Sequence, residues 1–140
     1  MKKIALLGST GSIGKQVIEV VKGNRESYQI LTLSAGYNAE LFLTQINELR
    51  PQIATFAGAL TCEQKSRIPT GVKCYFGEEA YLESIVSEVD LVFVALVGFV
   101  GLKAVLKSTD LKKDIALANK ESLVVGGELV LNAVKQSGVN

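Results

Sequence analysis

The sequence predicts an open, doubly wound α/β fold, in which helices cover a parallel β-sheet. Strand-like and helix-like segments alternate along the whole chain of 140 residues, and short turns join them. Such alternation is typical of successive strand–helix–strand units with parallel strands. The expected strand at 90–95 is almost entirely apolar, as are strands buried on both faces of a sheet. These observations indicate a single α/β domain.

A glycine-rich turn joins the first expected strand to the first expected helix. The apolar run at 4–7 is long enough for a buried strand and too short for a helix. Three glycines follow at equal spacing: Gly8, Gly11 and Gly14. Apolar residues then recur at helical spacing: Ile13, Val17, Val20 and Val21. The stretch is therefore typical of a strand, a tight turn and a helix.

The remaining elements continue the alternation. Further strands are expected at 28–34, 52–57, 72–76, 90–95 and 114–118. Helices are expected at 39–50, 78–86, 98–108 and 122–137, and Pro51 ends the first of them. A further short helix is expected directly after the capping box of Thr61 and Gln64. The helix at 39–50 is expected to bury one face: Leu41, Phe42, Gln45, Ile46 and Leu49.

Composition narrows the class of protein. With 48% hydrophobic and 21% charged residues the chain is typical of a globular domain with its own core. A net charge of +1 gives no electrostatic sign of nucleic-acid or membrane-surface binding. The apolar runs are too short for a signal peptide or a membrane span, so we expect a cytoplasmic protein. The chain contains no histidine, which excludes a histidine base or a histidine-ligated metal within it.

Two features concern the cysteines and the end of the chain. Cys62 and Cys74 form no CxxC motif and are expected to be free thiols. The last residues, 138–140, follow a helix and lead toward another strand. We therefore expect the chain to be a truncated domain.

The glycine turn suits the binding of an anion. A strand followed by a tight turn and a helix leaves backbone N–H groups pointing at one spot, where the helix dipole also favours negative charge. In dinucleotide-binding domains this is the pyrophosphate site: Gly8 would make the turn, Gly11 would admit the phosphates and Gly14 would let the helix pack on its strand. The spacing is GxxGxxG rather than GxGxxG, so a plain turn of small residues stays open as an alternative.

A P-loop is excluded as the identity of this turn. Ser9 stands where the first glycine of a P-loop is needed, and Gln16 replaces the Ser or Thr that holds magnesium.

The turn after the second strand, at 34–38, contains no carboxylate. NAD-binding domains place an acidic residue about twenty positions past the glycines, where it holds the ribose 2′-OH. A carboxylate there would repel the 2′-phosphate of NADP, so its absence favours NADP. The turn also lacks Arg and Lys, and an ordinary turn therefore stays open as an alternative.

Two more turns follow the last two strands. The glycines at 98 and 101 leave room for a cofactor ribose or nicotinamide, or else they only admit a helix onto the sheet. In the turn at 118–122, Lys120 offers a compact positive charge for a phosphate or a polarised oxygen. Alternatively, Glu121 favours the dipole of the next helix while Lys120 is merely solvated.

Four segments together resemble the 1-deoxy-D-xylulose 5-phosphate reductoisomerase family. They are GSTGSIG at 8–14, AGYN at 35–38, GFVGL at 98–102 and ANKESL at 118–123. They occur in the family's order, and the first and last are far more specific than glycine spacing alone. The resemblance implies that 1–140 is a Rossmann-like NADPH-binding domain. The family's enzyme rearranges and reduces 1-deoxy-D-xylulose 5-phosphate to 2-C-methyl-D-erythritol 4-phosphate for isoprenoid synthesis.

The same resemblance implies roles for single residues. The cofactor-binding residues would be Gly8, Thr10, Gly11, Ser12, Ile13, Gly14, Gly36, Tyr37, Asn38, Gly98, Asn119 and Glu121. Thr10 to Ile13 would hold the pyrophosphate, 36–38 the adenosine end, and Asn119 and Glu121 the nicotinamide side. Lys120 would contact the phosphorylated sugar substrate. Tyr37 stands where family members often have Lys or Arg.

The resemblance places other parts of the enzyme after residue 140. These are the acidic ligands of a divalent metal (Mg²⁺ or Mn²⁺), the flexible loop and the residues that bind the substrate phosphate. The chain therefore carries no complete catalytic set and no metal site, and the full-length protein is expected to be a homodimer. Two other hypotheses remain: the cofactor domain of another NAD(P)-dependent Rossmann reductase, such as a semialdehyde dehydrogenase, and a non-enzymatic nucleotide-sensing module.

Overall fold

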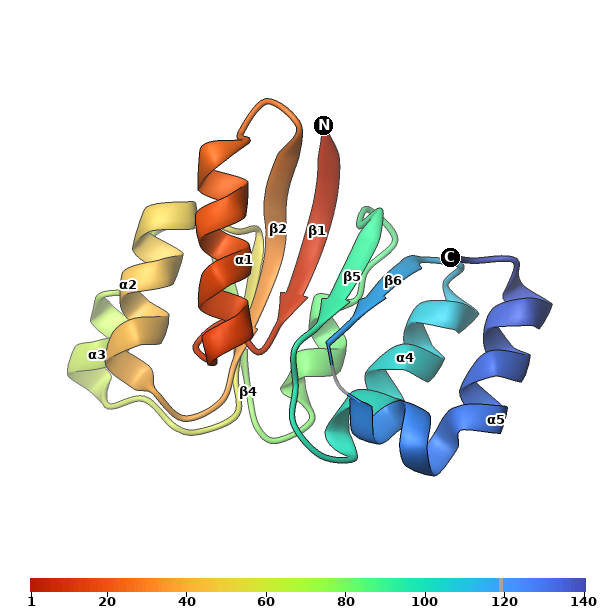
Figure 1. Cartoon of the computed structure of the whole chain (residues 1–140). Coiled ribbons are helices and arrows are strands. Elements are labelled where there is room, and N and C mark those ends of the chain that lie inside the picture. Colours follow the sequence, from red (N-terminus) through yellow and green to blue (C-terminus); the bar gives the residue numbers. More distant parts are fainter. Residues whose placement is uncertain (119) are drawn as a thin grey trace.

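The computed structural model confirms the parallel α/β architecture (Figure 1). It describes residues 1–118 and 120–140, except the side chains of 120–126. The strands are β1 (Lys2–Leu7), β2 (Tyr28–Ala35), β3 (Ile53–Phe56), β4 (Lys73–Phe76), β5 (Leu91–Val94) and β6 (Asp114–Leu117). Within the described residues they form one six-stranded sheet in the order β4-β3-β2-β1-β5-β6, and every neighbouring pair is parallel.

Helices connect the strands in the predicted order. They are α1 (Ser12–Gly23), α2 (Ala39–Leu49), α3 (Cys62–Ser66), the 3₁₀-helix η1 (Ala80–Ser84), α4 (Val100–Asp110) and α5 (Lys120–Ser137). The capping box of Thr61 and Gln64 begins α3 as predicted. Helix α5 begins at Lys120, two residues before the predicted start, so Lys120 and Glu121 belong to its first turn. Within the described residues no helix is long and apolar enough to cross a membrane.

The predicted α-helix at 78–86 is wrong, because this segment forms only the 3₁₀-helix η1. Its backbone bonds join residues three apart, as in Leu82 N–H to Glu79 O and Ile85 N–H to Leu82 O. The Ser84 carbonyl, which an α-helix would use for a following amide, accepts a hydrogen bond from Thr32 Oγ1 at 2.7 Å. A tertiary contact with β2 therefore takes the place of a further helical turn.

The core lies in two layers, one on each face of the sheet. On β1, Ile4 and Leu6 face α1 and α2, whereas Ala5 and Leu7 face α4 and α5. All four of these side chains are buried, as expected for a central parallel strand. Figure 1 shows α1 and α2 beside β1 to β3, and α4 and α5 beside β5 and β6.

The predicted buried face of α2 is only partly right. Phe42, Gln45 and Ile46 are buried, but Leu43 is buried as well, and Leu41 and Leu49 are only half-buried. The stripe therefore centres on residues 42, 43 and 46, which share one side of a helix at 3.6 residues per turn.

The prediction that β5 is buried on both faces is also only partly right. Val92 and Val94 are buried against α4, but Leu91 and Phe93 are half-buried on the face that carries α1. They line an apolar groove of about 360 Å³ with residues of α1, among them Val17 and Val20. The reason is topological, since α4 and α5 both pack on the opposite face.

Two glycines allow α1 to approach the end of β1. Gly8 has φ +91°, and a Cβ atom there would lie 2.8 Å from the carbonyl carbon of Ala95. A Cβ atom on Gly14 would lie 2.8 Å from Ser9 Cα and even closer to the Gly8 carbonyl oxygen. Glycine is therefore required at both positions, in the first because of conformation and space, and in the second because of space alone.

We expect Gly14→Ala to destabilise the domain by roughly 1–3 kcal/mol, because backbone on both sides of the contact must move to admit a methyl group. Gly23→Ala is the matched control at the other end of α1, where a Cβ atom would meet nothing within 4 Å. It should leave stability unchanged or raise it slightly, since alanine favours the helix. Urea unfolding measures both. Equal stability of the two variants would contradict the packing role of Gly14.

Candidate cofactor-binding site

The predicted site residues lie on turns at one edge of the sheet. In a parallel sheet the turns that follow neighbouring strands share the carboxyl edge, where ligands of α/β proteins bind. Leu7, the last residue of β1, is in register with Ser34 of β2 and with Val94 of β5. The structure thus brings together the glycine turn (Gly8–Gly14), the turn at 36–38 and Gly98.

The glycine turn is anchored to the ends of both neighbouring strands. The N–H groups of Gly8 and Ser9 both donate to the Ser34 carbonyl, at 2.9 and 2.8 Å. On the other side, the Ala95 N–H donates to the Leu7 carbonyl at 2.9 Å. The turn is closed by a bond from Gly11 N–H to the Gly8 carbonyl at 3.3 Å. Its backbone is therefore held in place by contacts within the chain.

The N-terminus of α1 is suited to an anionic ligand. Its N-cap is Gly11, no side chain caps it, and its first turn contains no acidic residue. By contrast, Asn38 caps α2 and Thr61 caps α3. Helix α4 also lacks a side-chain cap, at Phe99. The first N–H groups of α1, on Ser12 and Ile13, thus combine helix-dipole attraction with hydrogen-bond donors that no capping side chain uses.

The space beside Gly11 is open. A Cβ atom there would meet only the Gly8 carbonyl oxygen at 3.6 Å, an ordinary contact, and the backbone has φ −74° and ψ 171°. The fold itself therefore does not require glycine at this position. A requirement for glycine would come from a ligand, which is what a pyrophosphate-binding turn implies.

The turn at 36–38 has three different local roles. The Gly36 carbonyl accepts from the N–H groups of Ala57 and Gly58, at 3.1 and 3.2 Å. Asn38 Oδ1 accepts from the Leu41 N–H at 3.2 Å, so its side chain also serves as the cap of α2. Tyr37 is 70% exposed. A Cβ atom on Gly36 would meet nothing within 4 Å, which leaves room for a ligand beside the backbone.

A cavity of about 420 Å³ opens beside this turn. The turn at 34–37 and Val100, both within turns that the sequence singled out, line it together with residues that the sequence reasoning missed: Ala57, Gly77, Glu78, Tyr81, Leu96 and Val97. Ala57 and Gly77 directly follow β3 and β4, so attention to every carboxyl strand end would have found them. The tertiary course of η1 supplies Tyr81, and local sequence gives no signal for that.

The cavity wall is mainly apolar, with two groups that stand out chemically. Glu78 is the charged residue of the lining. The Tyr81 hydroxyl donates to the Val100 carbonyl at 3.1 Å, and burial raises the pKa of Tyr81 above its ordinary value. Tyr81 is therefore a neutral group that presents its ring to the cavity wall.

Gly98 has φ +75° and lies between β5 and α4. A Cβ atom there would meet nothing within 4 Å, so its backbone conformation, rather than crowding, favours glycine. The neighbours Val97 and Phe99 are 85% and 65% exposed. This turn presents apolar side chains at the same edge as the glycine turn.

Other predicted residues cannot be placed in the site. Asn119 lies outside the described residues, as do the side chains of Lys120 and Glu121. Among the described residues, no group of three or more His, Cys, Asp or Glu side chains is arranged to hold a metal ion. Cys62 and Cys74 are both free thiols, as predicted.

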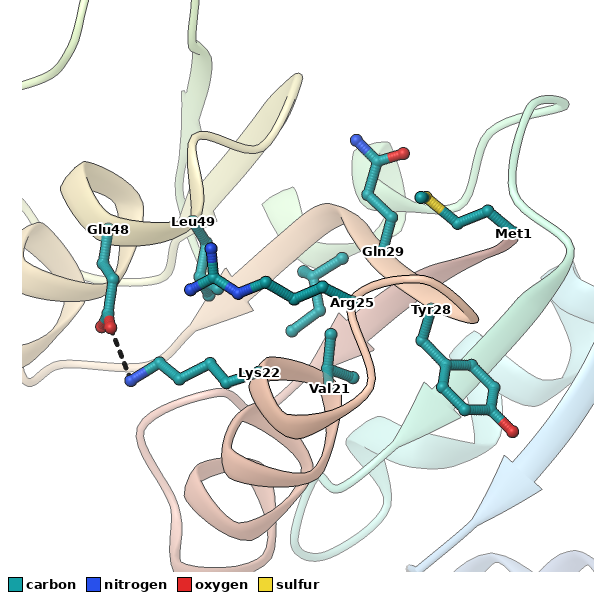
Figure 2. Close-up of a pocket in the computed structure, with 9 residues that line it drawn as sticks. Met1, Val21, Lys22, Arg25, Tyr28, Gln29, Glu48 and Leu49 are labelled. Atoms are coloured by element: carbon teal, nitrogen blue, oxygen red, sulfur yellow. Dashed lines mark ion pairs between the residues drawn. The ribbon is translucent and has the colours of Figure 1, made fainter.

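A second cavity lies at the opposite edge of the sheet, near the starts of β1 and β2 (Figure 2). It measures about 320 Å³, and Lys22 and Glu48 form an ion pair of 2.6 Å beside it. The hydrogen bonds that the Lys22 ammonium donates to the carboxylates of Glu48 and Glu19 raise the pKa of Lys22. None of the predicted site residues lines this cavity. The carboxyl edge is therefore the candidate site.

Comparisons with known proteins show which family the chain resembles. Residues 4–127 match the family model described as 1-deoxy-D-xylulose 5-phosphate reductoisomerase. The enzyme of that name from Solibacter usitatus is 42% identical over 99% of the chain, which spans 37% of that relative. The chain thus covers little more than a third of the length of the curated relatives it matches.

Two solved structures are similar over nearly the whole chain. The reductoisomerase from Zymomonas mobilis in complex with NADPH has a TM-score of 0.90 and 31% identity, over 99% of this chain and 37% of that one. A DOX-P reductoisomerase in complex with NADPH, fosmidomycin and magnesium has a TM-score of 0.90 and 29% identity, over 100% of this chain and 35% of that one.

Proposed function

Because this chain belongs to the 1-deoxy-D-xylulose 5-phosphate reductoisomerase family, we propose that it is the NADPH-binding part of such an enzyme. The enzyme would rearrange and reduce 1-deoxy-D-xylulose 5-phosphate to 2-C-methyl-D-erythritol 4-phosphate. The observation that carries the proposal is the uncapped start of α1 at a glycine turn, next to an open, mainly apolar cavity. The family match favours this function over a semialdehyde dehydrogenase or a nucleotide-sensing module.

Different residues at the carboxyl edge would bind different parts of the cofactor. Residues Thr10 to Ile13 would hold the diphosphate, with the backbone N–H groups of Thr10, Ser12 and Ile13 as donors, Gly11 leaving room for it and the dipole of α1 adding attraction. Gly36, Tyr37 and Asn38 would hold the adenosine end beside the cavity, and Gly98 would lie along the cofactor toward its nicotinamide. Bound NADPH would supply the hydride for the reduction. Asn119 and Glu121 would complete the nicotinamide side.

Lys120 would serve the substrate rather than the cofactor. It follows β6, one strand farther from the glycine turn than β5. A lysine ammonium is a compact charge suited to a substrate oxygen or phosphate. The residues that hold a divalent metal would lie in the remainder of a longer protein, since the relatives are much longer than this chain. We further propose a cytoplasmic homodimer, for which the two free thiols agree with a reducing compartment.

The first test is a valine at the diphosphate position. Gly11→Val should abolish NADPH binding and lower the melting temperature only slightly, because a Cβ atom at Gly11 would make one ordinary contact, although valine is a poorer N-cap than glycine. Gly23→Val, at the far end of α1, is the matched control and should bind normally. Calorimetric titration measures affinity. Unchanged affinity in Gly11→Val would remove the glycine turn from the site.

A second test concerns recognition of the 2′-phosphate. The unaltered chain should prefer NADPH to NADH, since its 34–38 turn has no carboxylate to repel the phosphate. Tyr37→Arg should tighten NADPH binding more than NADH binding, because a guanidinium pairs with phosphate in bidentate fashion. The control Tyr28→Arg adds the same charge at the start of β2 and should change the affinity for neither NADPH nor NADH. Equal effects of Tyr37→Arg on both cofactors would place this turn away from the 2′-phosphate.

The third test separates substrate from cofactor. The 140-residue chain alone should show no turnover, because it would lack the residues that hold the metal and position the substrate. Positioning of this kind can account for about 7–11 kcal/mol of an activation barrier. In the full-length protein, Lys120→Ala should reduce the rate severely and spare NADPH affinity, whereas Lys135→Ala, in the last turn of α5, should change neither. Steady-state rates and calorimetry provide the two readouts. If Lys120→Ala lost cofactor affinity as severely as it lost rate, the proposed substrate role of Lys120 would be wrong.

A further inference from the structure

A glutamine is buried beneath the glycine turn. Gln45 lies on α2 between apolar neighbours and is only 5% exposed. Its Nε2 donates to the Ser9 carbonyl at 2.9 Å, a contact between residues 36 positions apart. Among the residues that the structure describes, its Oε1 finds no hydrogen-bond partner. Burial of an amide with only part of its hydrogen bonds costs free energy. Within the described structure, the bond to Ser9 is the side-chain hydrogen bond that offsets this cost.

The bond to Gln45 determines which way one peptide unit faces. The Ser9 N–H is held by the Ser34 carbonyl at 2.8 Å, and the Ser9 carbonyl by Gln45. The described residues contain no cis peptide bond, so the Ser9–Thr10 peptide is trans. In a trans peptide the C=O of one residue and the N–H of the next point in opposite directions. With the Ser9 carbonyl directed at α2, the Thr10 N–H points away from α2.

We propose that Gln45 is a positioning residue for the diphosphate. It holds the Ser9–Thr10 peptide so that the Thr10 N–H faces the bound diphosphate before the cofactor arrives. The inference rests on the proposed function, because it presumes that the glycine turn binds a dinucleotide. Without the amide of Gln45 the buried Ser9 carbonyl would have no donor, and rotation of the peptide would carry the Thr10 N–H away from the ligand. Preorganised donors bind better because binding pays no ordering cost.

The test uses three ligands that differ in their phosphates. NADPH and inorganic pyrophosphate both carry a diphosphate, whereas adenosine 2′-monophosphate does not. Gln45→Met keeps the length of the side chain and removes the donor. It should weaken the binding of NADPH and of pyrophosphate roughly tenfold or more, which corresponds to the loss of one hydrogen bond to a charged group. Binding of adenosine 2′-monophosphate should stay unchanged. All affinities are measured well below the melting temperature of each variant.

Ser108→Ala is the matched control for loss of stability. Ser108 is fully buried in the second half of α4, and its Oγ also donates to a backbone carbonyl, that of Ala104 at 2.7 Å. This variant loses a comparable buried bond away from the turn and should bind all three ligands normally. If Gln45→Met weakens all three ligands equally, or none of them, Gln45 is only a structural residue and the inference is overturned.

A measurement on the unaltered chain covers the case in which Gln45→Met does not fold. The amide ¹H signal of Thr10 should shift on addition of pyrophosphate, as expected for a donor to the diphosphate. A Thr10 signal that stays in place while those of Ser12 and Ile13 move would overturn the role of Gln45 and leave the proposed function intact. Failure of the unaltered chain to bind NADPH would instead overturn the proposed function, and the inference with it.

Discussion

The close approach of α1 to the end of β1 is the constraint on which the candidate site depends. Gly14 contacts the backbone of Gly8 and Ser9 so tightly that a single methyl group has no room. This contact brings the start of α1 directly onto the glycine turn, where the helix dipole and the first N–H groups act on the same small volume. Backbone hydrogen bonds also connect the glycine turn to the end of β2, and the end of β1 to the end of β5. The turn is therefore anchored to the sheet, and the position of the candidate site follows from strand order.

Much of this arrangement was predictable because it depends on local pattern. Apolar runs, helical spacing and glycines identify the strands, the helices and the turn, and none of these requires knowledge of distant contacts. Two of the errors occur where distant contacts decide. The segment at 78–86 is a 3₁₀-helix because Thr32, some fifty residues earlier, bonds to Ser84. Leu91 and Phe93 are only half-buried because α4 and α5 share one face of the sheet, which the alternation of elements does not reveal.

The same division applies to the site. The glycine turn was predictable because its chemistry resides in the backbone, and sequence shows directly where side chains are missing. The cavity beside it was not, since its walls come from β3, β4, η1 and α4, whose positions only the sheet order determines. Gln45 was expected on the buried face of α2, but its partner Ser9 lies on another element. A polar residue at an apolar position was the available signal, and such a residue requires a partner.

The absence of a side-chain cap on α1 has a cost that the surrounding contacts offset. A glycine N-cap such as Gly11 is roughly a few tenths of a kcal/mol less favourable than the Asn38 and Thr61 caps of α2 and α3. On α1 a capping side chain would occupy the donors that a diphosphate needs, so capping and binding compete for the same N–H groups. The chain instead stabilises the turn from behind, through Ser34 and Gln45, whose bonds use the inward-facing groups of Gly8 and Ser9. The donors at the start of α1 stay available while the backbone that carries them stays ordered.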